Sequence, residues 1–382
     1  MSCRPARVLV VGAGIGGLTA ACALLRHGLE VEVLERSTEL GEVGAGLQIG
    51  PNGVRVLRAL GLERGLAQAV CEPDATVSVD GEHGEIRYRE PLRGVSAQRF
   101  GAPYLTAHRA DVHAALRAAL PAGAVRLGAV CTGAESHRSG AVATLEDGAE
   151  LEADVVVGAD GIRSAVRESQ FGADEPRFTG QICWRGIVPI SCVPAAVRPD
   201  DLAGWIAPNG HVICYPIRGG ELYNVFAGHV SGTWIEESWT VESSREELLA
   251  AYEGWHPALR AMLARIEHCF KWGIHDRDPL PRWTRGRVTL LGDAAHPMMP
   301  TLAQGASIAM EDGVALARHL AASPGDVPAA LAAYDTERVP RASRVQLQAR
   351  TQFQNNQRTP APPPLDRSWI FAHDATRDPV AS

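Results

Sequence analysis

Three glycines near the start of the chain restrict its fold more than any other feature. Gly12, Gly14 and Gly17 follow a short apolar segment, residues 7–11, and lead into an alanine-rich segment, residues 18–27. In such a strand–turn–helix unit the first glycine permits the tight turn, the second lets the backbone approach a pyrophosphate, and the third lets the helix pack closely on the strand. The phosphates then face the positive end of the helix. We therefore predict a dinucleotide-binding unit here.

An acidic residue completes this unit. Glu35 ends the next apolar strand, residues 31–34, where a carboxylate can accept hydrogen bonds from both ribose hydroxyls of a dinucleotide. Because the carboxylate would repel a 2′-phosphate, the site suits FAD or NAD rather than NADP. We expect Glu35 and the adjacent Arg36 to contact the cofactor. The alternative is a glycine-rich turn without a ligand, and the complete strand–helix–strand–acid pattern disfavours it.

The remaining chain alternates between two patterns. An α/β pattern at the start of the chain gives way to β-rich stretches in the middle. The α/β pattern then resumes, with an expected strand at 288–291 and an expected helix at 304–320. Pattern and order predict an α/β fold with a discontinuous Rossmann-like cofactor domain, an inserted β-rich substrate domain and a helical C-terminal segment. The expected boundaries are 1–75, 100–175 and 276–345 for the cofactor domain, 76–99 and 176–275 for the substrate domain, and 346–382 for the C-terminal tail.

Two local expectations refine this division. Four tryptophans in or near the inserted part are expected to pack its sheet rather than to stack on a substrate: Trp184, Trp205, Trp234 and Trp239. The proline-rich segment 359–364 cannot continue a helix. We expect it to lead to a short tail packed on the surface.

The overall composition limits partners and location. The formal net charge of −7 disfavours nucleic acid and anionic membranes, because both repel an acidic surface. The eight cysteines form no CxxC pair and fit no zinc pattern, so we expect reduced thiols and no metal site. The N-terminus lacks the pattern of a signal peptide, and no apolar stretch is long enough to span a bilayer. We therefore expect a cytoplasmic protein.

Two further motifs follow expected strands. Asp160 and Gly161 follow the strand 151–158, and Gly292-Asp293 follows the strand 288–291. Either alone is typical of an ordinary strand-end turn. In this order, and together with the N-terminal glycines, they resemble the class A flavoprotein monooxygenases of the para-hydroxybenzoate hydroxylase fold. The resemblance covers residues 7–338 and implies that the cofactor domain binds FAD.

The resemblance also implies roles for single residues. Asp293 corresponds to an aspartate that hydrogen-bonds the ribityl chain of FAD, and Arg109 to an arginine near the pyrophosphate. Asp160 and Gly161 correspond to a segment that contacts the pyrophosphate region indirectly and is linked to nicotinamide use. No second glycine fingerprint is present, which fits transient docking of NADH or NADPH on the FAD domain. A homodimer is expected from the resemblance alone.

The start of the helix at 304–320 is the expected site of the flavin ring. Free backbone N–H groups and the positive end of the helix stabilise negative charge on a reduced flavin. Gly305 lets the ring approach the backbone, and Ala306 follows it. Gln48 is a further candidate for this site, or else a loop amide that closes a turn. His296 is expected to be structural.

A histidine and a tyrosine mark the expected substrate pocket. His211 and Tyr215 share one face of a strand, because they are four residues apart. The pair, together with Gln304, resembles the 3-hydroxybenzoate 6-hydroxylase branch of the family. The resemblance implies that the histidine assists deprotonation of a substrate phenol and that the glutamine orients the substrate. The structural alternative is that His211 is a satisfied strand histidine and Tyr215 a packing residue.

These residues imply an FAD-dependent monooxygenase that hydroxylates a phenolic aromatic acid such as 3-hydroxybenzoate. The resemblance implies that NADH or NADPH reduces the flavin, which takes up O2 as a C4a-hydroperoxide and passes one oxygen atom to the ring. Salicylate, urate and hydroxynicotinate hydroxylases carry the same motifs and remain alternatives. Two other classes remain open: a flavin-dependent NADH oxidase or reductase without oxygen insertion, and a non-catalytic nucleotide-binding scaffold.

Overall fold

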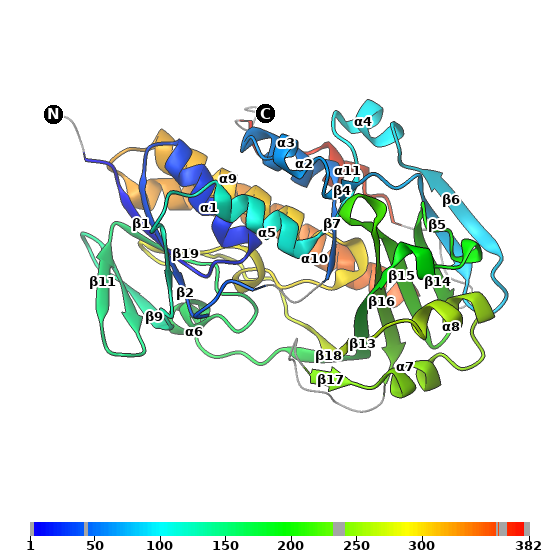
Figure 1. The fold of residues 1–382 in the computed structure, drawn as a ribbon. Helices are drawn as coiled ribbons and strands as arrows, with labels where there is room; N and C mark the ends of the chain where they lie inside the picture. The colour runs from blue at the N-terminus through cyan, green and yellow to red at the C-terminus, as the bar shows by residue number, and fades with distance from the viewer. Residues whose placement is uncertain (1–3, 42–44, 232–240, 357, 359–364, 378–382) are drawn as a thin grey trace.

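The computed structural model describes residues 4–41, 45–231, 241–356, 358 and 365–377. Within them, an α/β part built around a parallel sheet lies beside a large, mostly antiparallel sheet (Figure 1). Trp234 and Trp239 lie outside the described residues. In the described part of the chain, no helix is both long and apolar enough to cross a membrane.

The parallel sheet brings the three glycine-containing motifs to one edge. Its strand order is β19-β12-β1-β2-β8, and every neighbouring pair is parallel. The strands are β1 Arg7–Val11, β2 Glu30–Glu35, β8 Val125–Leu127, β12 Val155–Gly158 and β19 Val288–Leu290. Because β1, β12 and β19 are parallel neighbours, the turns at Gly12, Asp160 and Gly292 leave the same carboxyl edge, where open α/β sheets bind ligands.

Two three-stranded antiparallel sheets adjoin this core. One consists of β3 Gly46–Ile49, β4 Val70–Cys71 and β7 Leu105–His108, and the other of β9 Cys131–Ser136, β10 Ala141–Leu145 and β11 Glu150–Ala153. The single strand expected at 151–158 is therefore wrong, since β11 and β12 belong to different sheets. The chain turns at Asp154, whose carboxylate accepts a hydrogen bond from the Arg7 N–H at 2.7 Å. Alternation of apolar residues continues through this break, so the pattern does not reveal it.

The large sheet has eight strands in the order β17-β18-β13-β16-β15-β14-β5-β6. Their bounds are β5 Ala75–Asp80, β6 Ile86–Pro91, β13 Arg177–Pro189, β14 Leu202–Ala207, β15 Gly210–Ile217, β16 Leu222–Val230, β17 Val241–Ser243 and β18 Cys269–Asp276. Strands from the two separate stretches expected to be β-rich thus pair in one sheet, through β5 and β14.

The two faces of this sheet contact different parts of the molecule. One face packs in its own hydrophobic core against α7 Arg245–Ala251 and α8 Pro257–Leu263, which lie on the outer side in Figure 1. Trp184 and Trp205 are buried there, as predicted. The opposite face looks toward the α/β part. Because side chains alternate along a strand, every second residue of β15 faces that part.

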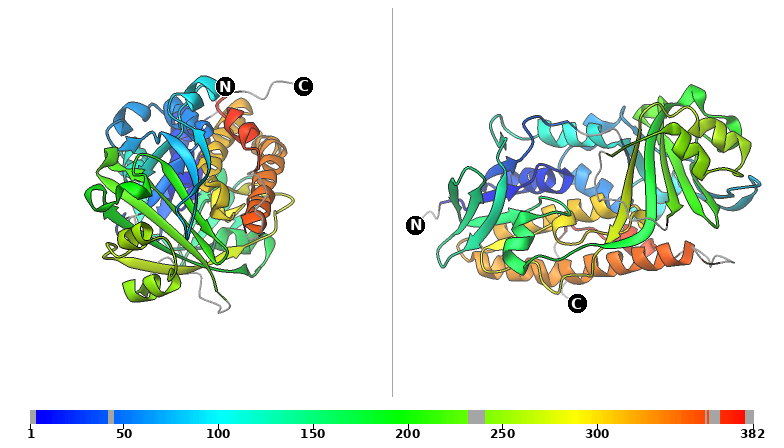
Figure 2. Two further views of the ribbon diagram at one scale, coloured as in Figure 1. Left: turned by 90° about the vertical axis from the view of Figure 1, so that its right-hand side faces the viewer. Right: turned by 90° about the horizontal axis from the view of Figure 1, so that it is seen from below.

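Helices cover the parallel sheet and join the two parts. They are α1 Ile15–Arg26, α2 Pro51–Ala59, α3 Glu63–Leu66, α4 Val95–Phe100, α5 Arg109–Ala118, α6 Ala165–Phe171, α9 Gly305–Ala322, α10 Val327–Asn356 and α11 Ser368–Ala372. Figure 2 shows α10, in orange, running beneath both parts of the molecule.

The C-terminal region differs from the expected surface tail. The boundary placed between 345 and 346 falls inside α10, which continues to Asn356 because Gln346, Ala349 and Phe353 are buried on one of its faces. Beyond the proline-rich segment, Ile370 and Phe371 of α11 are buried as well. Phe371 packs edge-on against Tyr104 at 5.8 Å between ring centroids. The helix α11 therefore belongs to the core.

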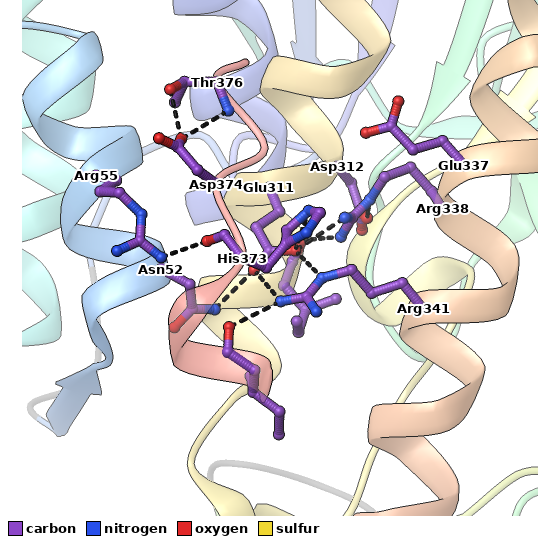
Figure 3. Close-up of polar contacts among 12 residues, drawn as sticks. Asn52, Arg55, Glu311, Asp312, Glu337, Arg338, Arg341, His373, Asp374 and Thr376 are labelled. Atoms are coloured by element: carbon purple, nitrogen blue, oxygen red, sulfur yellow. Dashed lines mark hydrogen bonds and ion pairs between the residues drawn. The ribbon is translucent and has the colours of Figure 1, made fainter. Parts of the chain in front are cut away.

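Four charged side chains between α9 and α10 form a buried charge cluster, defined here as Glu311, Asp312, Arg338 and Arg341 (Figure 3). Arg338 Nη1 lies 2.8 Å from Glu311 Oε2, and Arg338 Nε lies 2.9 Å from Asp312 Oδ1. Arg341 donates two hydrogen bonds to Glu311, at 2.7 and 2.8 Å. Buried carboxylates are stable only when they are paired in this way.

The charge cluster also holds two neighbouring parts of the chain in place: the turn after β19 and the residue that precedes α9. Asp312 Oδ2 accepts a hydrogen bond from the Gly292 N–H at 3.2 Å and lies 2.5 Å from His296 Nε2. Asn52 Nδ2 donates to Glu311 at 2.7 Å and to the Gln304 side-chain oxygen at 3.0 Å. His296 thus ties its own turn to the charge cluster, which is consistent with the structural role expected for it.

We expect the Arg338→Met variant to lose about 3–5 kcal/mol of unfolding free energy, because it leaves buried carboxylates with too little positive charge. Burial alone would raise the pKa of Glu311, but Arg338 and Arg341 outweigh burial and lower it to about 2. Denaturant-induced unfolding measures the loss.

The matched control is Arg58→Met, which breaks a solvent-exposed pair with Glu63 at 2.7 Å. Exposed pairs contribute about 0–1 kcal/mol. Similar losses in the two variants would show that the buried charge cluster does not stabilise the fold.

Candidate active site

A cavity of about 460 Å³ separates the carboxyl edge of the parallel sheet from the inner face of the eight-stranded sheet. Nine of the predicted site residues line it: Gly14, Gln48, Arg109, His211, Tyr215, Asp293, Gln304, Gly305 and Ala306. Gly161 lines it too. The structure thus brings together residues that are almost 300 positions apart in the sequence. Five other predicted residues lie outside the lining: Gly12, Gly17, Glu35, Arg36 and Asp160.

The N-terminal glycines divide into two kinds. Gly12 has a φ of +105°, and a Cβ there would lie 2.4 Å from the Ala159 carbonyl oxygen; a Cβ on Gly17 would lie 2.0 Å from the Gly12 oxygen. These two glycines therefore serve the turn itself. A Cβ on Gly14 would meet nothing within 4 Å, and Gly14 lines the cavity. The middle glycine thus leaves open space where a pyrophosphate is expected.

Glu35 holds the glycine turn in place. Its carboxylate accepts hydrogen bonds from the Ala13 N–H at 2.8 Å and from the Ser37 N–H at 2.9 Å. The side chain is half-buried, and Arg36 beside it is exposed. A carboxylate has further acceptor sites, so a contact with ribose hydroxyls stays a prediction for Glu35.

The two motif aspartates differ in their surroundings. Asp160 accepts hydrogen bonds from the Ser164 hydroxyl and, at 3.2 Å, from the Val166 N–H at the start of α6. Its carboxylate is thus engaged in its own loop, consistent with an indirect role. Asp293 lies deep in the molecule, but its side chain is exposed because it faces the cavity. Burial raises the pKa of Asp293, and the nearby His296 and Arg109 partly offset this effect.

The start of α9 forms another wall. Gln304 precedes the helix, and Gly305 and Ala306 begin it at the cavity. Ala303 has a left-handed φ of 52°, which is uncommon for a residue with a Cβ and is typical of functional sites. The Gln304 side-chain nitrogen is buried and has no hydrogen-bond partner among the described residues.

These features fit FAD. Gly14 leaves room for a pyrophosphate, Asp293 offers an acceptor within the cavity, and α9 begins at the cavity with the unbonded N–H groups that a helix N-terminus provides. A flavin ring beside the start of α9 would gain hydrogen bonds and favourable electrostatics when it carries negative charge.

The inner face of the eight-stranded sheet forms the opposite wall. His211, Ile213 and Tyr215 alternate along β15, and Phe226 of β16 lies beside them. The His211 ring stacks on Phe226 at 5.7 Å between ring centroids. Burial lowers the pKa of His211 to about 4, so its imidazole is neutral at pH 7. Burial raises the pKa of Tyr215, so its hydroxyl stays protonated.

Two cationic side chains of the cavity were missed in the sequence. Arg185 of β13 lies with its guanidinium carbon 4.4 Å from the Trp272 ring centroid, and Arg367 comes from the segment before α11. Alternation along β13 was available as a signal for Arg185, since its neighbour Trp184 packs on the other face. No local signal marks Arg367, because only the fold brings the C-terminal segment to the cavity.

Comparison with known proteins agrees with this geometry. A family model described as "FAD binding domain" matches residues 5–349. The chain is 37% identical to 6-hydroxynicotinate 3-monooxygenase from Pseudomonas fluorescens, over 98% of this chain and 96% of that protein. It is 40% identical to 3-hydroxybenzoate 6-hydroxylase from Polaromonas naphthalenivorans, over 92% and 88% of the two chains.

A solved structure gives the same result. The crystal structure of Klebsiella pneumoniae HpxO complexed with FAD and uric acid matches with a TM-score of 0.84 and 28% identity, covering 92% of this chain and 89% of that one. Both the sequence and the fold match over most of the chain. The chain therefore belongs to the FAD binding domain family, within its class A flavoprotein monooxygenases.

Proposed function

We propose that this protein hydroxylates a phenolic aromatic acid, with bound FAD, NADH or NADPH as reductant and O2 as oxidant. One observation carries the proposal. A single cavity is lined on one side by Gly14 and Asp293, from the turns expected to bind FAD, and on the other side by the buried His211 and Tyr215. Its relatives act on 6-hydroxynicotinate and 3-hydroxybenzoate by name, and both compounds carry a carboxylate and a ring hydroxyl.

The residues on the α/β side hold the cofactor. Gly14 admits the pyrophosphate, Asp293 accepts hydrogen bonds from the ribityl hydroxyls, and the N–H groups of Gly305 and Ala306 meet the flavin ring. Bound FAD supplies the reduction and oxygen-transfer chemistry, which no side chain of the cavity can supply. The mostly apolar walls exclude bulk water and so limit side reactions.

The residues on the sheet side bind and activate the substrate. The neutral imidazole of His211 accepts the proton of the substrate hydroxyl. This deprotonation activates the substrate, because a phenolate ring is more electron-rich than a phenol ring. A pKa of about 4 makes a free imidazole a weak base, but the negative charge formed beside it favours the protonated form and raises this pKa. Arg185 and Arg367 make the cavity attractive to an aromatic carboxylate.

The first test measures NADH and NADPH consumption by the FAD-loaded protein across hydroxylated aromatic and heteroaromatic acids, with mass analysis of the products. We expect at least one acid to accelerate consumption and to gain one oxygen atom. Consumption that no acid accelerates, with hydrogen peroxide as the sole product, would favour an oxidase or reductase instead.

We expect His211→Asn to lower kcat by about 10², the typical contribution of a general base. Its rate should recover toward high pH, because a phenol with a pKa of about 10 then ionises without help. In the unsubstituted enzyme the base must be unprotonated, so kcat/KM should fall as pH drops through about 4, rather than through the ordinary histidine value of about 6.5.

His229→Asn is the matched control for this variant. His229 lies on the neighbouring strand β16 and is not part of the cavity lining. An unchanged pH profile in His211→Asn would show that His211 only packs the sheet.

We expect Asp293→Ala to weaken FAD binding by about ten- to a hundredfold, since hydrogen bonds to a charged group contribute about 1.5–3 kcal/mol. Fluorescence titration of the apoprotein with FAD measures the dissociation constant without any turnover. Glu146→Ala, in an exposed turn, should bind FAD normally. If the unsubstituted protein, Asp293→Ala and Glu146→Ala all bind FAD equally well, Asp293 does not contribute to the FAD site.

A further inference from the structure

A buried histidine of α5 holds the backbone of the N-terminal glycine turn. His113 is 6% exposed, and its Nε2 atom lies 2.7 Å from the carbonyl oxygen of Ala13, 100 positions earlier in the sequence. A carbonyl oxygen only accepts hydrogen bonds, so Nε2 carries the proton of this bond. His113 follows Arg109 by one helical turn, and the two side chains therefore share one face of α5, the face from which Arg109 reaches the cavity.

Hydrogen bonds within the protein fix the first part of the turn. The Gly12 N–H donates to the Leu34 carbonyl at 2.7 Å, and the Ala13 N–H donates to the Glu35 carboxylate at 2.8 Å. No residue that the structure describes accepts a hydrogen bond from the next three N–H groups, which belong to the cavity-lining residues Gly14, Ile15 and Gly16. These are the backbone donors that the start of a helix offers to an anionic group.

The hydrogen bond from His113 sets the direction of one of these donors. The Ala13 carbonyl and the Gly14 N–H belong to the same peptide unit, and in a planar trans peptide they point in opposite directions. Because the carbonyl is held by His113, the N–H points away from His113. Gly14 has the conformational freedom of a residue without a Cβ. This peptide unit could therefore rotate at little cost if nothing held its carbonyl.

Other contacts keep α5 in place beside the turn. The Cys22 thiol donates to the Leu116 carbonyl at 3.4 Å, which ties α1 to α5. The Arg109 N–H donates to the Ala45 carbonyl at 2.9 Å, which ties the start of α5 to the residue before β3. Leu116 is itself fully buried. The His113 donor is thus fixed by the packing of its helix.

We propose that His113 is a positioning residue for the cofactor. Through the Ala13 carbonyl it holds the Gly14 N–H in the direction in which this group binds the FAD pyrophosphate. The placing of the pyrophosphate at Gly14 rests on the proposed function. His113 is not part of the cavity lining, so it acts on the cofactor only through the turn.

The test compares three substitutions of His113 in the FAD-loaded protein. His113→Met removes the donor, His113→Gln keeps an N–H near the place of Nε2, and His113→Asn keeps the amide but is too short to reach Ala13. Serial dilution followed by flavin fluorescence measures the dissociation constant of FAD without turnover. We expect the Met and Asn variants to bind FAD about three- to tenfold more weakly, the effect of one hydrogen bond. The Gln variant should bind FAD like the unsubstituted protein.

Gly14→Ala tests whether the effect of His113 passes through the turn. A Cβ at this position would meet no protein atom within 4 Å, so the fold stays intact, but the methyl group takes up space in which the pyrophosphate is expected. We expect Gly14→Ala to weaken FAD binding. Adding His113→Met to it should weaken binding no further, because the contact with the Gly14 N–H is already lost.

Leu116→Met is the matched control. It alters a fully buried side chain of the same helix without changing a hydrogen-bond donor, and it should bind FAD like the unsubstituted protein. Circular dichroism reports whether each variant is folded. If His113→Met does not fold, the comparison of His113→Asn with His113→Gln remains, since these two side chains differ by one methylene group.

The outcomes separate the two proposals. If the unsubstituted protein does not retain FAD, the proposed function fails and the role of His113 fails with it. If Gly14→Ala retains FAD equally well, the pyrophosphate does not lie at Gly14, and the role of His113 is overturned. The same holds if His113→Met binds FAD as tightly as the unsubstituted protein, if His113→Gln binds as weakly as His113→Met, or if the effects of His113→Met and Gly14→Ala simply add. In these cases hydroxylation with bound FAD stands as proposed.

Discussion

The pairing of Glu311 and Asp312 with Arg338 and Arg341 is the constraint on which the cavity depends. Removing two carboxylates from water is costly, and the pairing compensates this cost only when both arginines of α10 are in place. The same carboxylates hold Gly292 and, through Asn52, Gln304. One buried electrostatic arrangement therefore fixes both the turn that carries Asp293 and the start of α9.

The second constraint is the alternation of side chains in the eight-stranded sheet. Residues of one parity pack against α7 and α8, and residues of the other parity face the cavity. A shift of register by one residue would exchange the two sets and place Val212 and Cys214 where His211 and Tyr215 now lie. The hydrophobic core behind the sheet thus determines which chemistry the front of the sheet can present.

Much of the fold was predictable because its signals are local. The Gly12–Gly17 turn and the strand-end aspartates mark their own backbone geometry, and their order along the chain implies the parallel sheet. The break at Asp154 was not predictable, because alternation continues from β11 into β12. The boundary between 345 and 346 was misplaced because the last turns of α10 bury Gln346, Ala349 and Phe353, and this burial depends on contacts with distant segments.

The sequence by itself determined a dinucleotide-binding turn, the residues at the carboxyl edge of the sheet and the shared face of His211 and Tyr215, because each follows from short-range backbone geometry. Only the tertiary structure decided that these residues line one cavity and that Arg185 and Arg367 join them. Such contacts join segments that are distant in the chain. Their geometry depends on how sheets and helices pack, which no local pattern encodes.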